Sequence, residues 1–349
     1  MRALVCETFG QVAVRDVPEP TIQHPSDVVV SITTTTVCGS DIGLVHGHIP
    51  TEPGFILGHE YVGVVEQVGS AVTRLEPGRR VVGPAAPYCG LCPTCTRGQI
   101  QRCQRGGVLG SGAPWGGYGG TQAERLRVPH AERDLVAVPD ELTDEQVLFC
   151  GDILPTGWSA VQWTGLGPGD ALVILGAGPV GLAATLIAQL LAPRALVVVD
   201  PLPDRRELAL RLGATAVIDP VTEDVAAMVP ELTGGGPDGV VEAAGRTDTI
   251  VQATQLVRIG GTVAIVGIPP GPVEVPIADL LMRNVSLRQG LGHLGDMPRL
   301  VDLIRAGRLD ATPLITHRFG VGDLDAAFHA FERQEEGIIK PAISMVSDR

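Results

Sequence analysis

One stretch of the sequence, residues 171–191, restricts the possible folds more than any other. Residues 171–175 are apolar and fit a buried strand, and an uncharged segment with helical character follows at about 179–191. The turn that joins them reads Gly176-Ala177-Gly178-Pro179-Val180-Gly181, which fits G-x-G-x-x-G. Because a strand, a tight glycine turn and a helix form the first part of a βαβ unit, this stretch predicts a parallel sheet.

Strands and helices continue to alternate through the middle of the chain, which predicts a doubly wound α/β domain. Further elements of this kind are expected at residues 195–200, 204–212, 216–218, 239–242 and 262–267. Residues 1 to about 85 are instead β-rich. The C-terminal part of the chain carries two helical patterns and a closing strand, at residues 297–305, 323–333 and 341–346.

The glycine turn indicates a site for a dinucleotide. Glycines let the backbone approach a diphosphate, and the helix N-terminus offers free N–H groups. Asp200 ends the next expected strand, 24 positions after Gly176, and would accept hydrogen bonds from the adenosine ribose. Its charge favours NAD over NADP, although Arg205 and Arg206 keep NADP open. The competing interpretation is a glycine-rich turn that binds no nucleotide.

Four cysteines form the most specific motif of the chain, Cys89-x2-Cys92-x2-Cys95-x7-Cys103. Four thiolates at this spacing can enclose one tetrahedral Zn²⁺ with no open position, as in a structural site. The surrounding residues 86–120 show little periodicity, so a bound metal would be needed to order them. The iron–sulfur run C-x2-C-x2-C-x3-C-P has a shorter last gap. A lobe with another metal, or with none, is the alternative to zinc.

The composition excludes several classes of partner. A net charge of −13 argues against nucleic acid and against an anionic membrane surface. The N-terminus lacks the long apolar run of a signal peptide. Seven cysteines, four of them clustered, suit metal binding in a reducing cytoplasm better than disulfides. Lys340 is the only lysine, so lysine-based catalysis is not expected.

A polar pair interrupts an apolar run near the N-terminus. Residues 55–65 would fit one buried strand, but Gly58-His59-Glu60 lies within them. Burying an imidazole beside a carboxylate is costly unless both have partners, and a divalent metal is such a partner. A catalytic zinc uses three protein ligands and an open position, and Cys38 and Asp152 could complete the set. Their separations from His59, 21 and 93 residues, do not by themselves join the three.

These motifs resemble those of the zinc-dependent medium-chain alcohol dehydrogenases over essentially the whole chain. The similar phrases are the glycine turn, the four-cysteine run, Cys38-Gly39-Ser40-Asp41, Gly58-His59-Glu60 and Gly151-Asp152-Ile153-Leu154-Pro155-Thr156-Gly157. The last phrase and residues 48–55 look most like the formaldehyde-dehydrogenase-like and the sorbitol- and threonine-dehydrogenase-like branches.

The resemblance implies an α/β protein of two domains. A GroES-like, β-rich catalytic domain would contain residues 1–153 and 292–349, with a zinc-binding lobe at 86–113. A Rossmann domain with a doubly wound parallel sheet would contain residues 154–291. The active site would lie in the cleft between them, and the assembly would be a homodimer or a homotetramer.

The resemblance also implies the roles of single residues near the metal. Cys38, His59 and Asp152 would bind the catalytic zinc, and Glu60 could enter the zinc shell when substrate or water is absent. Ser40 would take the proton from the zinc-bound alcohol. The structural zinc would be bound by Cys89, Cys92, Cys95 and Cys103.

On the coenzyme side, Thr156 would lie against the nicotinamide. Backbone around Val266, Gly267 and Gly290 would shape the pocket of its carboxamide. The glycine turn, Asp200 and Arg205 would bind the remainder of the coenzyme.

The implied activity is that of an alcohol dehydrogenase or carbonyl reductase with two zinc ions per chain. It would transfer hydride between NAD and a zinc-bound alcohol, with a small alcohol, aldehyde or ketone as substrate. One alternative is a formaldehyde-dismutase-like enzyme that retains its NAD. Another is a catalytically silent, NAD-binding structural relative, against which the intact set Cys38, His59 and Asp152 argues.

One position departs from the pattern of the family. Gly43 stands where relatives often carry the histidine that ends a proton relay. His46, His48 or ordered water could replace it, although both histidines fit solvent-facing loop positions better. Cys150, two residues before Asp152, would share its face of a strand and is expected to be a small buried thiol.

Overall fold

The computed structural model describes residues 1–335 and 337–346 and divides the chain into two compact units. Unit 1 is built from both ends of the chain, residues 1–152 and 293–349. Unit 2 is the continuous segment 153–292.

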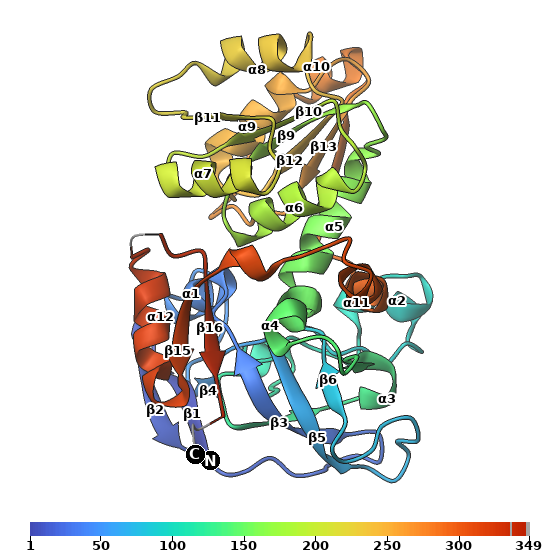
Figure 1. Cartoon of the computed structure of the whole chain (residues 1–349), viewed down its shortest axis with the longest axis vertical. Helices are drawn as coiled ribbons and strands as arrows, with labels where there is room; N and C mark the ends of the chain where they lie inside the picture. The colour runs from blue at the N-terminus through green and yellow to red at the C-terminus, as the bar shows by residue number, and fades with distance from the viewer. Residues whose placement is uncertain (336, 347–349) are drawn as a thin grey trace. The chain divides into compact units, whose positions relative to one another are not determined.

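A six-stranded parallel sheet forms the middle of unit 2, in the order β11-β10-β9-β12-β13-β14 (Figure 1). The order reverses between β9 and β12, which is the switch point where ligands bind in sheets of this kind. The strands are β9 (Ala171–Leu175), β10 (Ala195–Val199), β11 (Ala216–Ile218), β12 (Gly239–Glu242), β13 (Thr262–Ile265) and β14 (Ser286–Gln289).

Two layers of helices cover this sheet because its central strands are apolar on both faces. β9, β10 and β12 are buried along their full length, as strands between two helical layers are. α6 packs against α5 and α7, and α8 packs against α9. The helices are α5 (Ile153–Thr164), α6 (Pro179–Gln189), α7 (Pro203–Arg211), α8 (Val225–Thr233), α9 (Thr247–Leu256) and α10 (Ile277–Met282).

Antiparallel pairing dominates unit 1. One sheet has the order β15-β16-β3-β5-β6-β8 with β7 beside β3, and a smaller sheet has the order β2-β1-β4. β16 pairs with β3, which joins the two ends of the chain. The strands are β1 (Arg2–Thr8), β2 (Gln11–Asp16), β3 (Val28–Thr35), β4 (Phe55–Ile56), β5 (Tyr61–Val68), β6 (Arg80–Val82), β7 (Arg125–Val128), β8 (Val136–Ala137), β15 (Ile315–Gly320) and β16 (Lys340–Ser344).

Short helices connect these strands, and α12 packs on β15, β16 and β2. The core of unit 1 combines residues from both ends of the chain, for example Leu4, Tyr61, Phe328 and Ile343. The helices are α1 (Gly39–Val45), α2 (Pro93–Thr96), α3 (Ala131–Asp134), α4 (Asp144–Val147), α11 (Met297–Arg305) and α12 (Leu324–Glu332).

The predicted fold class, a doubly wound parallel sheet with a β-rich partner, is confirmed. Residues 55–65 do not form one strand, as the polar pair within them indicated. The run is split into β4 and β5 because Gly58, at φ +94°, turns the backbone between them. A Cβ at Gly58 would lie 2.6 Å from Thr121 Oγ1, so this turn requires glycine.

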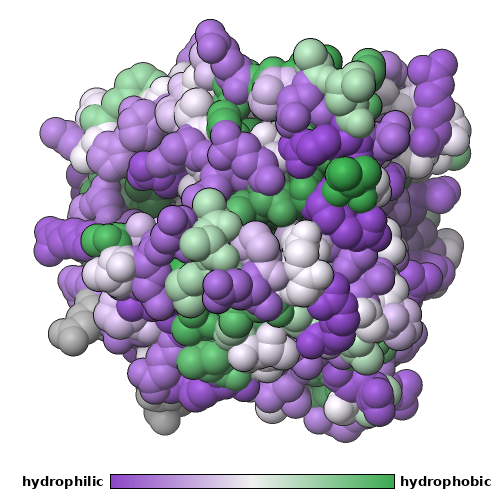
Figure 2. Space-filling view, turned by 90° about the horizontal axis from the view of Figure 1, so that it is seen from above, coloured by the Kyte–Doolittle hydropathy of each residue, from purple (hydrophilic) through white to green (hydrophobic). Residues whose placement is uncertain are grey.

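Apolar side chains reach the surface in patches among polar residues, as Figure 2 shows for one face. In unit 2, Ile277, Leu281 and Met282 of α10 are 60%, 70% and 79% exposed. They precede β14, which lies at the edge of the sheet. No helix of the described ranges has both the length and the apolarity needed to cross a membrane.

Candidate active site

The break between β4 and β5 carries His59 and Glu60 into the interior of unit 1. Their exposed fractions are 3% and 1%. The backbone of the break is fixed by residues 121–122, because Thr121 N donates to Gly58 O and Gln122 N donates to Leu57 O. Two polar side chains are therefore held where solvent does not reach them.

Three groups surround the imidazole of His59. Its Nδ1 lies 3.2 Å from Oδ1 of Asp41, and its Nε2 lies 3.3 Å from Ser40 Oγ and 3.4 Å from Asp152 Oδ2. Burial opposes protonation, but the charges of Asp41 and Cys38 outweigh it and raise the pKa of His59 well above its ordinary value. One ring nitrogen thus faces Asp41 and the other faces Ser40 and Asp152.

Helix α1 presents Cys38 and Ser40 at its N-terminal end. Cys38 N donates to Oδ2 of Asp41 at 2.9 Å, and Gln122 Nε2 donates to the same oxygen at 3.1 Å. Because Asp41 is fully buried and contacts both the Cys38 backbone and His59, it fixes these residues relative to each other.

Asp152 reaches the same place from the turn that follows residues 148–151. Its Oδ2 lies 3.6 Å from Cys38 Sγ and 3.4 Å from His59 Nε2. Burial acts to raise the pKa of Asp152, but the neighbouring His59 outweighs it, so the pKa is lowered. The structure thus brings Cys38, His59, Glu60 and Asp152 together, with one donor atom from each within 4.8 Å of the others.

This donor set fits a zinc ion. Zinc bonds of about 2.0–2.3 Å separate the ligand atoms of a tetrahedral site by roughly 3.3–3.8 Å. The distances from Asp152 Oδ2 to His59 Nε2 and to Cys38 Sγ, 3.4 and 3.6 Å, fall in that range. A thiol, an imidazole and a carboxylate are also the ligand types that zinc prefers.

Lys340 neutralises Glu60 from β16. Its Nζ donates to Oε1 of Glu60 and, at 2.8 Å, to the backbone oxygen of Val37. Lys340 is fully buried, yet the charges of Glu60 and Cys38 outweigh burial and raise its pKa. Burial raises the pKa of Glu60 to about 7, although Lys340 opposes this. Glu60 Oε2 has no hydrogen-bond partner among the described residues.

Sequence reasoning missed Lys340 as a member of this site. The available signal was its position: the only lysine of the chain stands in an otherwise apolar run, residues 338–343. A lysine that must be buried needs a carboxylate, and Glu60 was the buried carboxylate without a partner.

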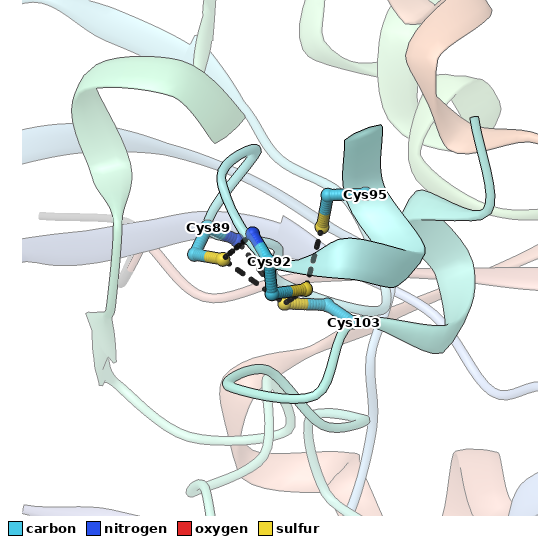
Figure 3. A group of neighbouring side chains, drawn as sticks. All are labelled: Cys89, Cys92, Cys95 and Cys103. Atoms are coloured by element: carbon cyan, nitrogen blue, oxygen red, sulfur yellow. Dashed lines mark hydrogen bonds between the residues drawn. The ribbon is translucent and has the colours of Figure 1, made fainter. Parts of the chain in front are cut away.

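The four cysteines of the lobe also converge, as Figure 3 shows. Sγ atoms are separated by 3.4 Å between Cys92 and Cys95, by 3.6 Å between Cys89 and Cys103, and by 3.8 Å between Cys92 and Cys103. These distances match the ligand spacing of a tetrahedral zinc. The lobe has no other large core, since its cluster consists mainly of these cysteines with Ala86, Ile100 and Leu294.

The surroundings lower the pKa of Cys89 and Cys92, whereas burial raises the pKa of Cys95 and Cys103. Leu91 N and Cys92 N point at Cys89 Sγ, and Arg105 N points at Cys103 Sγ, at 3.3–3.5 Å. A hydrogen bond from the Thr94 hydroxyl contributes most to lowering the pKa of Cys92 to about 5. Such donors stabilise negative sulfur, which is the form that binds zinc.

In unit 2 the glycine turn joins the C-terminal end of β9 to α6. A Cβ at Gly181 would lie 1.9 Å from Gly176 O, so that position excludes any side chain. A Cβ at Gly178 would meet only Arg205 Nη1, at 4.0 Å, within the described residues. Open space therefore adjoins the free N–H groups of α6, which suits a diphosphate.

Asp200 directly follows β10 and supports this turn. Its Oδ2 accepts from Ala177 N at 2.7 Å, and its Oδ1 accepts from Leu202 N at 2.9 Å. Arg205 Nη1 lies 3.9 Å from Oδ2 of Asp200. Arg206 donates to the backbone oxygen of Asp200 at 2.7 Å and pairs with Asp219 at 3.1 Å, so its guanidinium is already engaged.

The other predicted residues of unit 2 are distributed over three elements. Val266 and Gly267 follow β13, and their N–H groups donate to the backbone oxygen of Glu242. Gly290 follows β14. Thr156 lies in α5, where Gly292 packs so closely that a Cβ on it would be 2.7 Å from Thr156 Oγ1.

One expectation about a neighbouring residue needs revision. Cys150 lies in a 3₁₀ turn, residues 148–151, and not on a strand, so the argument from a shared strand face was wrong. The thiol is fully buried, and burial raises its pKa well above the ordinary value for cysteine. His46 is exposed, as expected of a solvent-facing position, and it hydrogen-bonds Glu332 of α12 at 2.7 Å. At Gly43, a Cβ would lie 3.1 Å from Ile49 Cδ1.

Comparisons with known proteins agree with this description. A family model for the alcohol dehydrogenase GroES-like domain matches residues 24–140, and one for zinc-binding dehydrogenases matches residues 179–306. An alcohol dehydrogenase of Cupriavidus necator is 34% identical, with 98% of each chain covered.

Solved structures are similar over the whole chain. The alcohol dehydrogenase TADH from Thermus sp. ATN1 is 39% identical, with a TM-score of 0.94 and 99% of each chain covered. A zinc-binding dehydrogenase from Sinorhizobium meliloti, solved with NADP bound, is 30% identical, with a TM-score of 0.89 and 99% of each chain covered.

Replacing Lys340 by methionine should strongly destabilise the protein, because it leaves the Glu60 charge buried without its cation. We expect the free energy of unfolding to fall by about 3–5 kcal/mol, measured by urea titration. Glu60→Gln added to Lys340→Met should recover part of the loss.

Arg211→Met is the matched control, since Arg211 pairs with Glu207 on the surface with 62% and 70% exposure. Its loss should be below about 1 kcal/mol. Equal losses in the two single variants would contradict the assigned role of Lys340.

Proposed function

The chain belongs to the zinc-dependent medium-chain alcohol dehydrogenases, and on that premise we propose that it oxidises small alcohols, or reduces the matching aldehydes or ketones, with NAD(H). The observation that carries the proposal is the convergence of Cys38, His59, Glu60 and Asp152 within 4.8 Å. The Ser40 hydroxyl lies beside this set, 3.3 Å from His59 Nε2.

In the proposed site Cys38, His59 and Asp152 hold one zinc ion. Bound zinc would acidify an alcohol hydroxyl or polarise a carbonyl, as Lewis-acidic zinc does. Ser40 Oγ would accept the hydroxyl proton of the substrate. Asp41 keeps His59 in one orientation through the contact at Nδ1.

Charge balance supports a divalent ion in this set. Cys38, Glu60 and Asp152 carry three negative charges when ionised, and Lys340 supplies one positive charge. A divalent cation would cancel the charge of these four groups and leave only that of Asp41, which faces His59 Nδ1. We therefore propose that Glu60 remains paired with Lys340 in the resting enzyme and is not a permanent zinc ligand.

The lobe is proposed to hold a second, structural zinc. Its four sulfur atoms leave no position for a substrate, and the lobe lacks another core that could order it.

The seven cysteines form no disulfide with one another, which supports the expected reducing cytoplasm.

NAD is the proposed coenzyme. The buried Asp200 carboxylate stands beside the glycine turn, where it would repel a 2′-phosphate. Arg205, 3.9 Å from Asp200, is the residue that would soften this preference. Because the Sinorhizobium meliloti relative was solved with NADP bound, binding of both coenzymes has to be measured.

A homo-oligomer is proposed as the assembly, with the β14 edge of unit 2 as the contact between copies. The edge strand offers unpaired backbone groups, and α10 beside it exposes Ile277, Leu281 and Met282. A second copy related by a two-fold axis would present the same apolar surface, so the two surfaces are self-complementary.

Metal analysis and a substrate panel test the proposed chemistry. Wild type should contain two zinc ions per chain and turn over primary or secondary alcohols. Cys38→Ser should contain one zinc and lose turnover without losing its fold, because only the catalytic site loses a ligand. Cys150→Ala, which removes a buried thiol close in sequence to Asp152, should keep both zinc ions.

Two zinc ions in Cys38→Ser, or full turnover by it, would contradict the assignment. If nicotinamide survives purification and aldehydes dismutate without added coenzyme, the formaldehyde-dismutase-like alternative holds. Absence of turnover with the whole panel would favour the silent NAD-binding relative.

Coenzyme preference is tested by fluorescence titration with NADH and NADPH. Wild type should bind NADH more tightly, and Asp200→Asn should narrow the difference by about tenfold because it removes the charge. Arg205→Ala should weaken the binding of NADPH more than the binding of NADH. Tighter binding of NADPH by wild type would overturn the role given to Asp200.

Sedimentation velocity tests the proposed contact. Wild type should sediment as a dimer or tetramer, and Leu281→Glu should shift it toward monomer because charge would be buried in the contact. Val221→Glu is the control, since Val221 is 76% exposed in the loop after β11. An unchanged assembly in Leu281→Glu would reject this surface.

A further inference from the structure

Glu242 is a buried carboxyl for which the proposed reaction has no role. It is the last residue of β12 and is fully buried. Its neighbours in register are Leu175, the last residue of β9, and Ile265, the last of β13. Because β9 and β12 flank the switch point, Glu242 lies at the edge of the sheet where a dinucleotide would bind.

The two oxygens of Glu242 have unequal surroundings. Oε1 accepts from Ala244 N at 3.0 Å, from Gly245 N at 2.8 Å and from Thr249 Oγ1 at 2.8 Å. Oε2 has no hydrogen-bond partner among the described residues. A full negative charge would leave Oε2 buried without a donor, which is costly.

The carboxyl group is packed into the junction of two loops. A Cβ at Gly267 would lie 2.6 Å from Glu242 Oε2 and 2.3 Å from Gly245 N, so only glycine fits there. A Cβ at Gly176 would lie 2.8 Å from Ala244 N. Glu242 therefore holds the loop that contacts the first glycine of the turn.

No cation on the elements packed against β12 compensates Glu242. β9, β13, α5 and α6 contain no charged residue. α9 contributes Asp248, which is exposed and pairs with Arg246 at 2.9 Å. Burial is the largest influence on the pKa of Glu242 and raises it, against hydrogen bonds from Thr249 and from loop N–H groups.

We propose that Glu242 is a proton-linked positioning residue of the coenzyme site, which takes up a proton on Oε2 when a dinucleotide diphosphate binds at the glycine turn. The inference rests on the proposed coenzyme function. The proton comes from the buffer, an O–H bond forms at Oε2, and the carboxylate becomes a neutral carboxylic acid. Oε1 keeps its three donors, so the loop keeps its place beside Gly176.

The direction of the effect follows from charge. A diphosphate beside the turn adds negative charge, which raises the pKa of Glu242 above its value in the free protein. Between the free and bound pKa values, binding takes up a proton and affinity falls as pH rises, by at most about tenfold per pH unit. Below both values, or above both, binding and proton uptake are uncoupled.

The composition of unit 2 makes this effect measurable. Residues 153–292 contain no histidine, cysteine, lysine or tyrosine. Proton uptake near neutral pH by groups of this unit must therefore come from a carboxyl group. Among them Glu242 has a raised pKa, whereas Asp238 and Asp248 have lowered ones.

The experiment is calorimetric titration of the zinc-loaded full chain with ADP-ribose between about pH 5 and 8. ADP-ribose carries the diphosphate but no nicotinamide, so it leaves the metal site undisturbed. Two buffers with different ionisation enthalpies give the number of protons taken up. Wild type should show uptake that rises toward one proton and vanishes at both ends of the range.

Three variants make the assignment specific. Glu242→Gln keeps the shape and one acceptor oxygen and should lose the uptake. Thr249→Val removes a donor from Oε1, so the uptake should move to higher pH. Glu231→Gln changes an exposed glutamate of α8 and should behave as wild type.

Binding heats that do not depend on the buffer in wild type, or uptake that persists in Glu242→Gln, would overturn the inference while leaving the coenzyme site intact. If ADP-ribose does not bind at all, the proposed coenzyme function fails, and this inference with it. If Glu242→Gln does not fold, the inference is tested by two other results. Proton uptake in wild type must depend on pH as described, and in Thr249→Val it must move to higher pH.

Discussion

Unit 1 depends on one constraint: a thiol and several carboxyl groups are buried around a single imidazole. Cys38 comes from the start of α1, His59 and Glu60 from the break between β4 and β5, and Asp152 from the turn before α5. Buried negative groups repel one another unless cations accompany them. Lys340, carried by β16, supplies one cation, and a divalent metal would supply the remainder. The pairing of β16 with β3 therefore links the C-terminal part of the chain to the chemistry of its N-terminal part.

The sequence predicted the parts whose signals are local. The glycine turn, the strand before it and the helix after it lie as their periodicity indicated, with β9 at Ala171–Leu175 and α6 from Pro179. Contacts between distant segments left no such signal. Lys340 contacts Glu60, and Asp41 contacts His59. The only hint of these contacts in the sequence was the residue type, a single lysine in one case and an acid in the other. The polar pair His59-Glu60 marked the interruption of the apolar run, but the geometry of the turn could not be read from hydropathy because it depends on the positive φ of Gly58.

The two units differ in the chemistry that their residues permit. Unit 1 holds all seven cysteines, all eight histidines and the only lysine, which are the residues that bind metals and move protons. Unit 2 holds none of these, and its sheet core is almost free of charge apart from Glu242 and the edge residue Asp200. A sheet core with so few charged side chains suits a diphosphate bound by backbone N–H groups, because helix dipoles then act with little competition from buried charges. Glu242 is the exception, and its unpaired oxygen is the reason to expect a proton-linked role.

The most direct test of the account is anomalous diffraction at the zinc edge from crystals of the protein grown with zinc and without coenzyme. The account predicts two peaks per chain: one among the four lobe cysteines, and one bonded to Cys38 Sγ, His59 and Asp152, with Glu60 Oε1 still on Lys340. A single peak in the lobe, or a second peak whose ligands do not include Cys38, His59 and Asp152, would contradict it.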